Sequence, residues 1–186
     1  MTDIKHTTPT KILWLDLEMT GLDATKDRII EVGAIMTNWD FNELGTFESG
    51  IKQDPRLIEE FEWLKTQPAL QKQMLELSAG SPPEAEVLAK LMEFVNSLVP
   101  PDEIMLLAGN SIHMDRGFIR QWWPELEKRL HYRMLDVSAW KVVMQAKYGQ
   151  EFAKKESHRA LDDIRESMAE LQDYLKWVHV PDDSLQ

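Results

Sequence analysis

Five residues have the types and local settings that metal and proton chemistry requires: Asp16, Glu18, Asp115, His158 and Asp163. Asp16 and Glu18 lie at the end of an apolar run, residues 11–17, which is typical of a strand covered on both faces. Alternate residues of a strand point to the same face, so both carboxylates can be directed at one point. Carboxylates held together there repel each other and lose hydration, and a divalent cation would offset both costs. Oxygen-only ligands favour a hard ion such as Mg²⁺ or Mn²⁺ over zinc.

The later candidates lie around the start of a final amphipathic helix, expected over residues 161–177. Asp163 lies beside its apolar stripe, where the side chain could enter a cleft, but helical periodicity does not distinguish it from Asp162. His158 precedes the helix in a polar segment. That setting suits a proton acceptor, because the unperturbed pKa of histidine is about 6.5.

Each of these features, taken alone, has a simpler explanation. An Asp-x-Glu pair at a strand end is usually solvated, and Asp162-Asp163 fits the acidic first turn that the helix macrodipole favours. Large apolar side chains such as Leu22 and Trp63 are more often buried in a core than placed in a binding site. The catalytic interpretation depends on the occurrence of all five residues together and in order.

Composition limits the partners and the compartment. The chain has 186 residues, 43% of them hydrophobic, which is enough for the core of one domain. The lack of cysteine excludes disulfides and thiolate metal sites and makes a reducing cytoplasm the expected compartment. No apolar run approaches the ~20 residues of a membrane span, and residues 1–10 lack the apolar segment of a signal peptide. The net charge of −11 argues against binding long nucleic acids by charge alone, but it permits a short one held by metal ions and a few specific contacts.

The order of the expected elements indicates an α/β domain without repeats. Strands are expected at residues 11–17, 28–37, 47–52, 104–108 and 133–135, with a hairpin turn at residues 38–40. Helices are expected over residues 54–74 with an interruption at Pro68, from 81 to 98, near Asp115, over 136–148 and over 161–177. Residues 11–178 are predicted to form a single domain between a flexible N-terminal segment (1–10) and a C-terminal tail (179–186).

Four segments follow one another in the order typical of the DEDDh exonucleases: WLDLEMTGLD, GNSIHMDRGF, HYRMLDVS and HRALDDIRESMAEL. The chain resembles the oligoribonuclease group of that family, within the ribonuclease H-like superfamily, over most of its length but poorly over residues 54–100. The resemblance implies a ribonuclease H-like fold, with a mixed five-stranded sheet flanked by helices, and a homodimer. It also implies metal-dependent 3′-to-5′ hydrolysis of short oligoribonucleotides, dinucleotides included, to 5′-mononucleotides.

The same resemblance implies individual roles. His158 would be the general base, and two Mg²⁺ or Mn²⁺ ions would be held by Asp16, Glu18, Asp115 and Asp163. The family has four residues between its histidine and its aspartate, which selects Asp163 over Asp162. Leu22 corresponds to an apolar wedge between the two terminal bases, and Trp63 to an aromatic pocket wall. The 5′ end of the substrate would be held by Ser111, Tyr132, Arg133 and Ser138, with Tyr132 contributed by the partner subunit.

One departure from the family affects the expected substrate length. Family members usually carry a histidine a few residues beyond the tryptophan that corresponds to Trp63, where it serves the 5′-phosphate cap. Here the stretch reads LKTQPALQ, and no histidine lies between His6 and His113. The cap is therefore expected to be weaker or to use Lys65 or Gln67, and the advantage of dinucleotides to be modest.

Two other functions remain as alternatives. A DEDDh exonuclease that acts on longer RNA or DNA 3′ ends would need a basic path for its substrate, which the charge of −11 argues against. A non-catalytic nucleic-acid-binding protein is disfavoured, because every predicted ligand and the predicted base are present.

Overall fold

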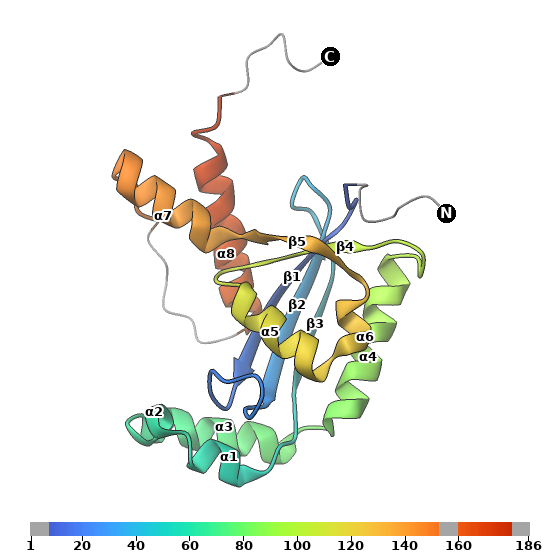
Figure 1. Ribbon diagram of the computed structural model, residues 1–186, viewed down its shortest axis with the longest axis vertical. Helices are drawn as coiled ribbons and strands as arrows, with labels where there is room; N and C mark the ends of the chain where they lie inside the picture. Colours follow the sequence, from blue (N-terminus) through green and yellow to red (C-terminus); the bar gives the residue numbers. More distant parts are fainter. Residues whose placement is uncertain (1–7, 153–159, 180–186) are drawn as a thin grey trace.

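The computed structural model describes residues 8–152 and 160–179, and within these ranges the chain forms a five-stranded mixed sheet with helices on both faces (Figure 1). The strands are β1 (Ile12–Met19), β2 (Ile29–Thr37), β3 (Glu43–Gly50), β4 (Met105–Gly109) and β5 (Leu130–Asp136). The strand order is β3-β2-β1-β4-β5. The β3-β2 and β2-β1 pairs are antiparallel, whereas β1-β4 and β4-β5 are parallel. The predicted fold class is confirmed.

The helices are α1 (Pro55–Glu59), α2 (Glu62–Lys65), α3 (Pro68–Gly80), α4 (Glu84–Leu98), α5 (His113–Trp122), α6 (Pro124–Glu127), α7 (Val137–Tyr148) and α8 (Ala160–Leu175). None of these described helices is long and apolar enough to cross a membrane. The predicted segment boundaries at residues 1–10 and 179–186 lie largely outside the described residues.

Three predicted elements differ most from the structure, whereas the helix predicted from residue 81 begins at Glu84 and the last helix ends at Leu175 rather than at residue 177. β3 begins at Glu43 rather than at residue 47, because it is an edge strand whose half-exposed residues give only a weak hydrophobic pattern. β5 covers seven residues instead of the predicted 133–135. Residues 54–74 do not form one interrupted helix: α1 ends at Glu59, α2 is a single turn, and α3 begins at Pro68, where proline is tolerated in the first turn.

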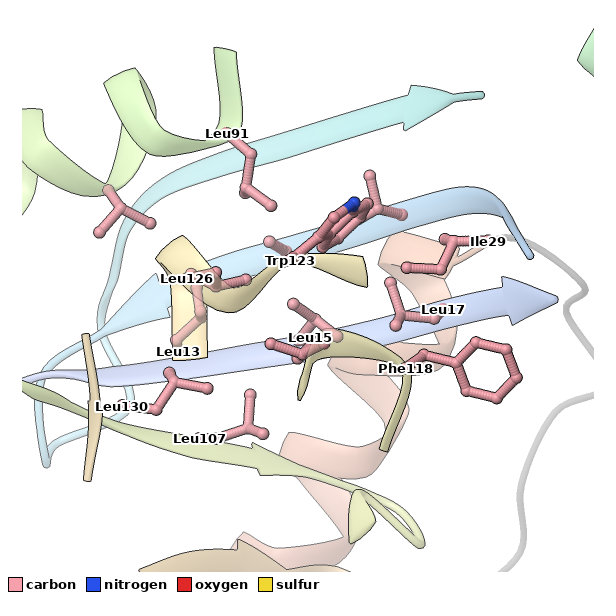
Figure 2. Close-up of a cluster of buried hydrophobic side chains, with 14 of the residues drawn as sticks. Leu13, Leu15, Leu17, Ile29, Leu91, Leu107, Phe118, Trp123, Leu126 and Leu130 are labelled. Atoms are coloured by element: carbon pink, nitrogen blue, oxygen red, sulfur yellow. The ribbon is translucent and has the colours of Figure 1, made fainter. Parts of the chain in front are cut away.

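β1 is apolar because helices cover both of its faces. On one face its odd-numbered residues pack against α4, α5 and the α5–α6 junction, in a cluster that includes Leu13, Leu15, Leu17, Leu91, Phe118 and Trp123 (Figure 2). On the other face Ile12 and Trp14 pack against α7 and α8. The even-numbered face continues to Asp16 and Glu18, so these two carboxylates lie on the side of the sheet that α8 covers.

The helices α1, α2 and α3, here called the small-helix region (residues 55–80), lie at one end of the sheet, apart from α7 and α8 (Figure 1). A small cluster of four buried residues attaches them to β2: Ile30, Ile58, Leu64 and Met74. This attachment buries far fewer side chains than either face of the central sheet.

Candidate active site

The end of β1 lies against the first turn of α8. Asp16 pairs with Gly33 of β2, and a Cβ added to Gly33 would lie only 2.7 Å from the Cβ of Ala160, the first residue of α8. Glycine is needed here, since real Cβ atoms essentially never approach another heavy atom to less than 3.0 Å. The close contact brings the first turn of α8, which carries Asp163, next to the strand that carries Asp16 and Glu18.

Asp115 reaches the same place from α5. β4 pairs with β1 only as far as Trp14, which leaves the backbone N–H of Leu17 available to a side chain. This N–H donates a hydrogen bond of 3.0 Å to Oδ1 of Asp115, whose side chain is buried. Because Leu17 lies between Asp16 and Glu18 in the sequence, the bond holds Asp115 beside both.

The four predicted ligands, here called the carboxylate cluster (Asp16, Glu18, Asp115 and Asp163), act on one another electrostatically. The pKa of Asp16 is raised to about 8, first by burial and then by the carboxylates of Asp115, Glu18, Asp163 and Glu31. Burial also raises the pKa of Asp115 to about 7, against two backbone hydrogen bonds that lower it. Carboxyl groups that resist ionisation near neutral pH favour the binding of positive charge, and oxygen donors alone suit a hard divalent cation.

The carboxylate cluster does not form a complete metal-binding site in this structure. Among residues 8–152 and 160–179, no three Asp, Glu or His side chains are grouped tightly enough to hold a metal ion as they stand. His158, the predicted general base, lies outside the described residues. The fit of a divalent cation therefore rests on the raised pKa values and on the donor chemistry.

The structure distinguishes Asp163 from its neighbour Asp162. Asp163 is half-buried and is one of the groups that raise the pKa of Asp16. The side chain of Asp162 is 57% exposed, and its Oδ1 lies 3.8 Å from Nη1 of Arg165. Only Asp163 of this pair belongs to the electrostatic environment of Asp16.

The predicted wedge and the predicted pocket wall line one cavity. Leu22 and Trp63 are 71% and 53% exposed, so neither is a core residue. Together with Glu18 they line a cavity of about 420 Å³, whose apolar wall also includes Phe61 and Met74. Sequence reasoning did not identify Phe61 and Met74, because each is one apolar residue in a region of short helices.

The residues predicted to hold the 5′ end of the substrate fall into two groups. The N–H of Ser111 donates to Oγ of Ser138 at 2.9 Å, and the two hydroxyl oxygens are 3.1 Å apart. Tyr132 and Arg133 are exposed neighbours, with the Arg133 guanidinium carbon 5.2 Å from the centre of the Tyr132 ring. Tyr132 precedes Asp136 by four residues of strand, about 13 Å, and is therefore well separated from Ser138 within one chain.

Comparison with known proteins identifies the family. A family model described as Exonuclease (RNase_T) matches residues 13–171. The chain belongs to this exonuclease family. Its curated relatives include the oligoribonuclease of Neisseria meningitidis, 39% identical over 168 residues that cover 88% of this chain and 89% of that protein. The mitochondrial oligoribonuclease of Homo sapiens is 40% identical over 173 residues, which cover 88% of this chain and 71% of that protein. These findings confirm the resemblance to the oligoribonucleases of the DEDDh group.

Solved structures of exonuclease I share the fold at low identity. Exonuclease I of E. coli in complex with a dT13 oligonucleotide has a TM-score of 0.62 at 17% identity and covers 90% of this chain. The enzyme from Methylocaldum szegediense has a TM-score of 0.61 at 17% identity and covers 89%. This chain spans only 41% and 40% of those two proteins. Identity this low supports the fold alone.

Proposed function

We propose that this chain is a metal-dependent 3′-to-5′ exoribonuclease that degrades short oligoribonucleotides, dinucleotides included, to 5′-mononucleotides. The main support is the electrostatic coupling of Asp16 to Glu18, Asp115 and Asp163, which come from three separate elements. The curated relatives at about 40% identity are oligoribonucleases, which agrees with this assignment.

The carboxylate cluster would hold two Mg²⁺ or Mn²⁺ ions. When bound, such ions neutralise charge on the phosphoryl oxygens and lower the pKa of water. The contribution of the chain is to hold Asp16 and Asp115 in a partly dehydrated setting, where both carboxyl groups have raised pKa values. Carboxylates in such a setting attract a cation more strongly than they would in water.

His158 would accept the proton of the attacking water, and the 3′-hydroxyl of the penultimate nucleotide would leave. His158 is two residues before Ala160 in the sequence, and Ala160 packs against Gly33, which pairs with Asp16. Histidine suits this role, because its neutral form is abundant near pH 7.

The terminal bases would be separated by Leu22 and supported by Trp63 in the 420 Å³ cavity. Ser111 and Ser138 would hold the 5′ end, and the remaining contacts would come from Tyr132 and Arg133 of a second copy of the chain. A homodimer of this kind is supported by the separation of Tyr132 from Ser138 and by exposed apolar side chains on β5 and α7: Tyr132, Met134, Val142 and Val143.

The substitute for the missing cap histidine stays a prediction. Gln67 is exposed at the start of α3, whereas Nζ of Lys65 already lies 2.5 Å from Oε1 of Glu62. Lys65 would have to leave this ion pair to contact a phosphate. A modest advantage of dinucleotides is therefore still expected.

The test is hydrolysis of 5′-phosphorylated RNAs of two to twenty nucleotides, with Mg²⁺, with Mn²⁺ and with EDTA. The expected result is metal-dependent release of 5′-mononucleotides, most efficient for the shortest RNAs and only modestly better for dinucleotides than for five to seven nucleotides. Full activity in EDTA would contradict the metal-dependent mechanism. A preference for the longest RNAs would favour an exonuclease of the tRNA-trimming type, and no hydrolysis at any length would favour a binding protein.

A further inference from the structure

Glu31 is the unusual residue of β2. The strand has nine residues, and Glu31 is the only one of them that is not buried. It lies opposite Glu18 in the antiparallel β1-β2 ladder. Residues paired in this way share a face of the sheet, with their Cα atoms about 4.5–5.5 Å apart. Glu31 therefore belongs to the surface of the candidate active site, although none of the recognised motifs contains it.

Glu31 and Glu18 line a second cavity, of about 150 Å³. Its other walls include Trp63, Met74 and Gln73. Because Glu18, Trp63 and Met74 also line the 420 Å³ cavity, the two cavities adjoin. The lining of the smaller cavity thus combines polar groups, from Glu18, Glu31 and Gln73, with the aromatic ring of Trp63.

In a nucleotide, the sugar lies between the phosphate and the base. The candidate site offers groups in the same order: Asp16 for the phosphate, the two glutamates for the sugar and Trp63 for the base. Under the proposed function, the scissile phosphate lies at Asp16 and the terminal base lies against Trp63. Glu18 is two residues beyond Asp16 on β1, about 6–7 Å, and Glu31 is its cross-strand neighbour. Both glutamates border the cavity that Trp63 lines. The sugar of the 3′-terminal nucleotide would then lie over Glu18 and Glu31.

We propose that the Glu31 carboxylate recognises this sugar by accepting hydrogen bonds from its vicinal 2′- and 3′-hydroxyls, with Gln73 beside it. The inference rests on the proposed exonuclease function and deepens it. The 3′ end of RNA carries this diol, whereas the 3′ end of DNA carries a single hydroxyl. A carboxylate has two acceptor oxygens, and acidic side chains bind ribose hydroxyls in the same way in dinucleotide-binding folds. Glu31 would thus select RNA over DNA at the terminal nucleotide.

The test compares two 5′-phosphorylated dinucleotides that differ only in the 2′-hydroxyl of the 3′-terminal nucleotide, with the full chain in Mn²⁺. A hydrogen bond to a charged group changes binding by about tenfold or more, so the wild type should have a KM about tenfold lower for the ribonucleotide end. Glu31→Gln keeps the shape but loses the charge, and it should reduce this ratio to about threefold or less. The change should fall mainly on the KM for the ribonucleotide end, because the deoxy-terminated substrate offers Glu31 only its 3′-hydroxyl.

Glu76→Gln is the matched control, because it removes the same charge from an exposed residue of α3 and should keep the wild-type ratio. Calorimetric binding of 5′-AMP and of its 2′-deoxy analogue supplies a readout without turnover, and Glu31→Gln should abolish most of the difference between them. An unchanged substrate ratio in Glu31→Gln would overturn the proposal.

Two further results would also overturn it while the exonuclease function stands. One is equal cleavage of both dinucleotides by the wild type. The other is an equal loss of kcat on both substrates together with weaker Mn²⁺ binding in Glu31→Gln, which would place Glu31 at the metals. Failure of the wild type to cleave either dinucleotide would instead overturn the proposed function, and this inference with it.

Discussion

The carboxylate cluster and the small-helix region differ in how they are held. Asp16 and Glu18 are fixed by the register of the central sheet, Asp115 by the backbone of Leu17, and the helix of Asp163 by its close contact with Gly33. All of these contacts are made by elements that contribute to the two large buried clusters.

One cluster of four buried residues packs the small-helix region on β2, and the largest aromatic side chain of this region, Trp63, is 53% exposed. It also contains the segment in which the family histidine is missing. Under the proposed function, the chemistry would depend on the core, where substitution is costly. Base contacts and substrate length would depend on the less buried small-helix region.

The largest effect is expected from removal of a proposed metal ligand. Asp163→Ala should lower kcat by about 10³-fold or more, because a metal contributes several kcal/mol to stabilisation of the transition state. Asp162→Ala, the adjacent and exposed control, should lower it by less than about threefold. Steady-state hydrolysis of a 5′-phosphorylated dinucleotide measures both, with circular dichroism to show that both variants fold. Equal losses in the two variants would contradict the assignment of Asp163.

The sequence predicts the residues of the carboxylate cluster better than it predicts the residues that line the two cavities beside it. Asp16 and Glu18 follow from the two-residue period of a strand, and the fold class follows from the order of apolar segments. The proposed role of Glu31 depends on the pairing register of β1 and β2, which shifts just after Glu18, and a register is not visible in one strand alone. Short helices such as α1 and α2 contain too few turns for a periodic pattern, so their boundaries could not be placed.

The next largest effect tests whether the contact between Gly33 and the start of α8 holds Asp163 in position for catalysis. Gly33→Ala would force its Cβ against Ala160, with a cost of about 1–3 kcal/mol to the free energy of unfolding. A displacement of Asp163 by about 1 Å could lower kcat by about 10²-fold. Gly80→Ala, where an added Cβ meets nothing within 4 Å, is the matched control in the small-helix region and should leave both quantities nearly unchanged. Thermal unfolding and dinucleotide hydrolysis of the two variants measure the difference, and normal activity in Gly33→Ala would argue against positioning by this contact.

A smaller effect is expected in the small-helix region itself. Trp63→Ala should raise the KM for dinucleotides roughly tenfold, because stacking of a base on an aromatic side chain is worth about 1–3 kcal/mol. Its kcat and its unfolding temperature should change little, since the side chain is half exposed. Trp39→Ala is a control of similar exposure, 46%, in the β2–β3 connection. A fall in kcat without a change in KM would mean that Trp63 acts on the chemistry rather than on the base.

The smallest effect concerns the stability of the metal-free protein. Two carboxyl groups have pKa values displaced in opposite directions. Burial and neighbouring carboxylates raise the pKa of Asp16, in the carboxylate cluster, to about 8. Hydrogen bonds from Arg56 lower the pKa of Asp54, the N-cap residue just before the small-helix region, to about 2. A raised pKa means that the folded state binds more protons than the unfolded state, so stability falls as the pH rises from about 4 towards 8. A lowered pKa has the opposite effect on stability: it stabilises the folded state near neutral pH, and this stabilisation is lost only as the pH falls below about 4.

In EDTA, the unfolding temperature of the wild type should therefore fall between pH 5.5 and pH 8.5, and saturating Mn²⁺ should reverse the fall because the cation binds the ionised carboxylates. A loss of 1 kcal/mol lowers the unfolding temperature by about 2–4 °C in a chain of this size, which calorimetry resolves. Asp16→Asn should flatten this slope, because the amide carries no charge at either pH. Asp54→Asn should leave it unchanged and alter stability only below about pH 4. The same slope in Asp16→Asn and the wild type would show that the carboxylate cluster is not under electrostatic strain, and the contrast between the two regions would then rest on packing alone.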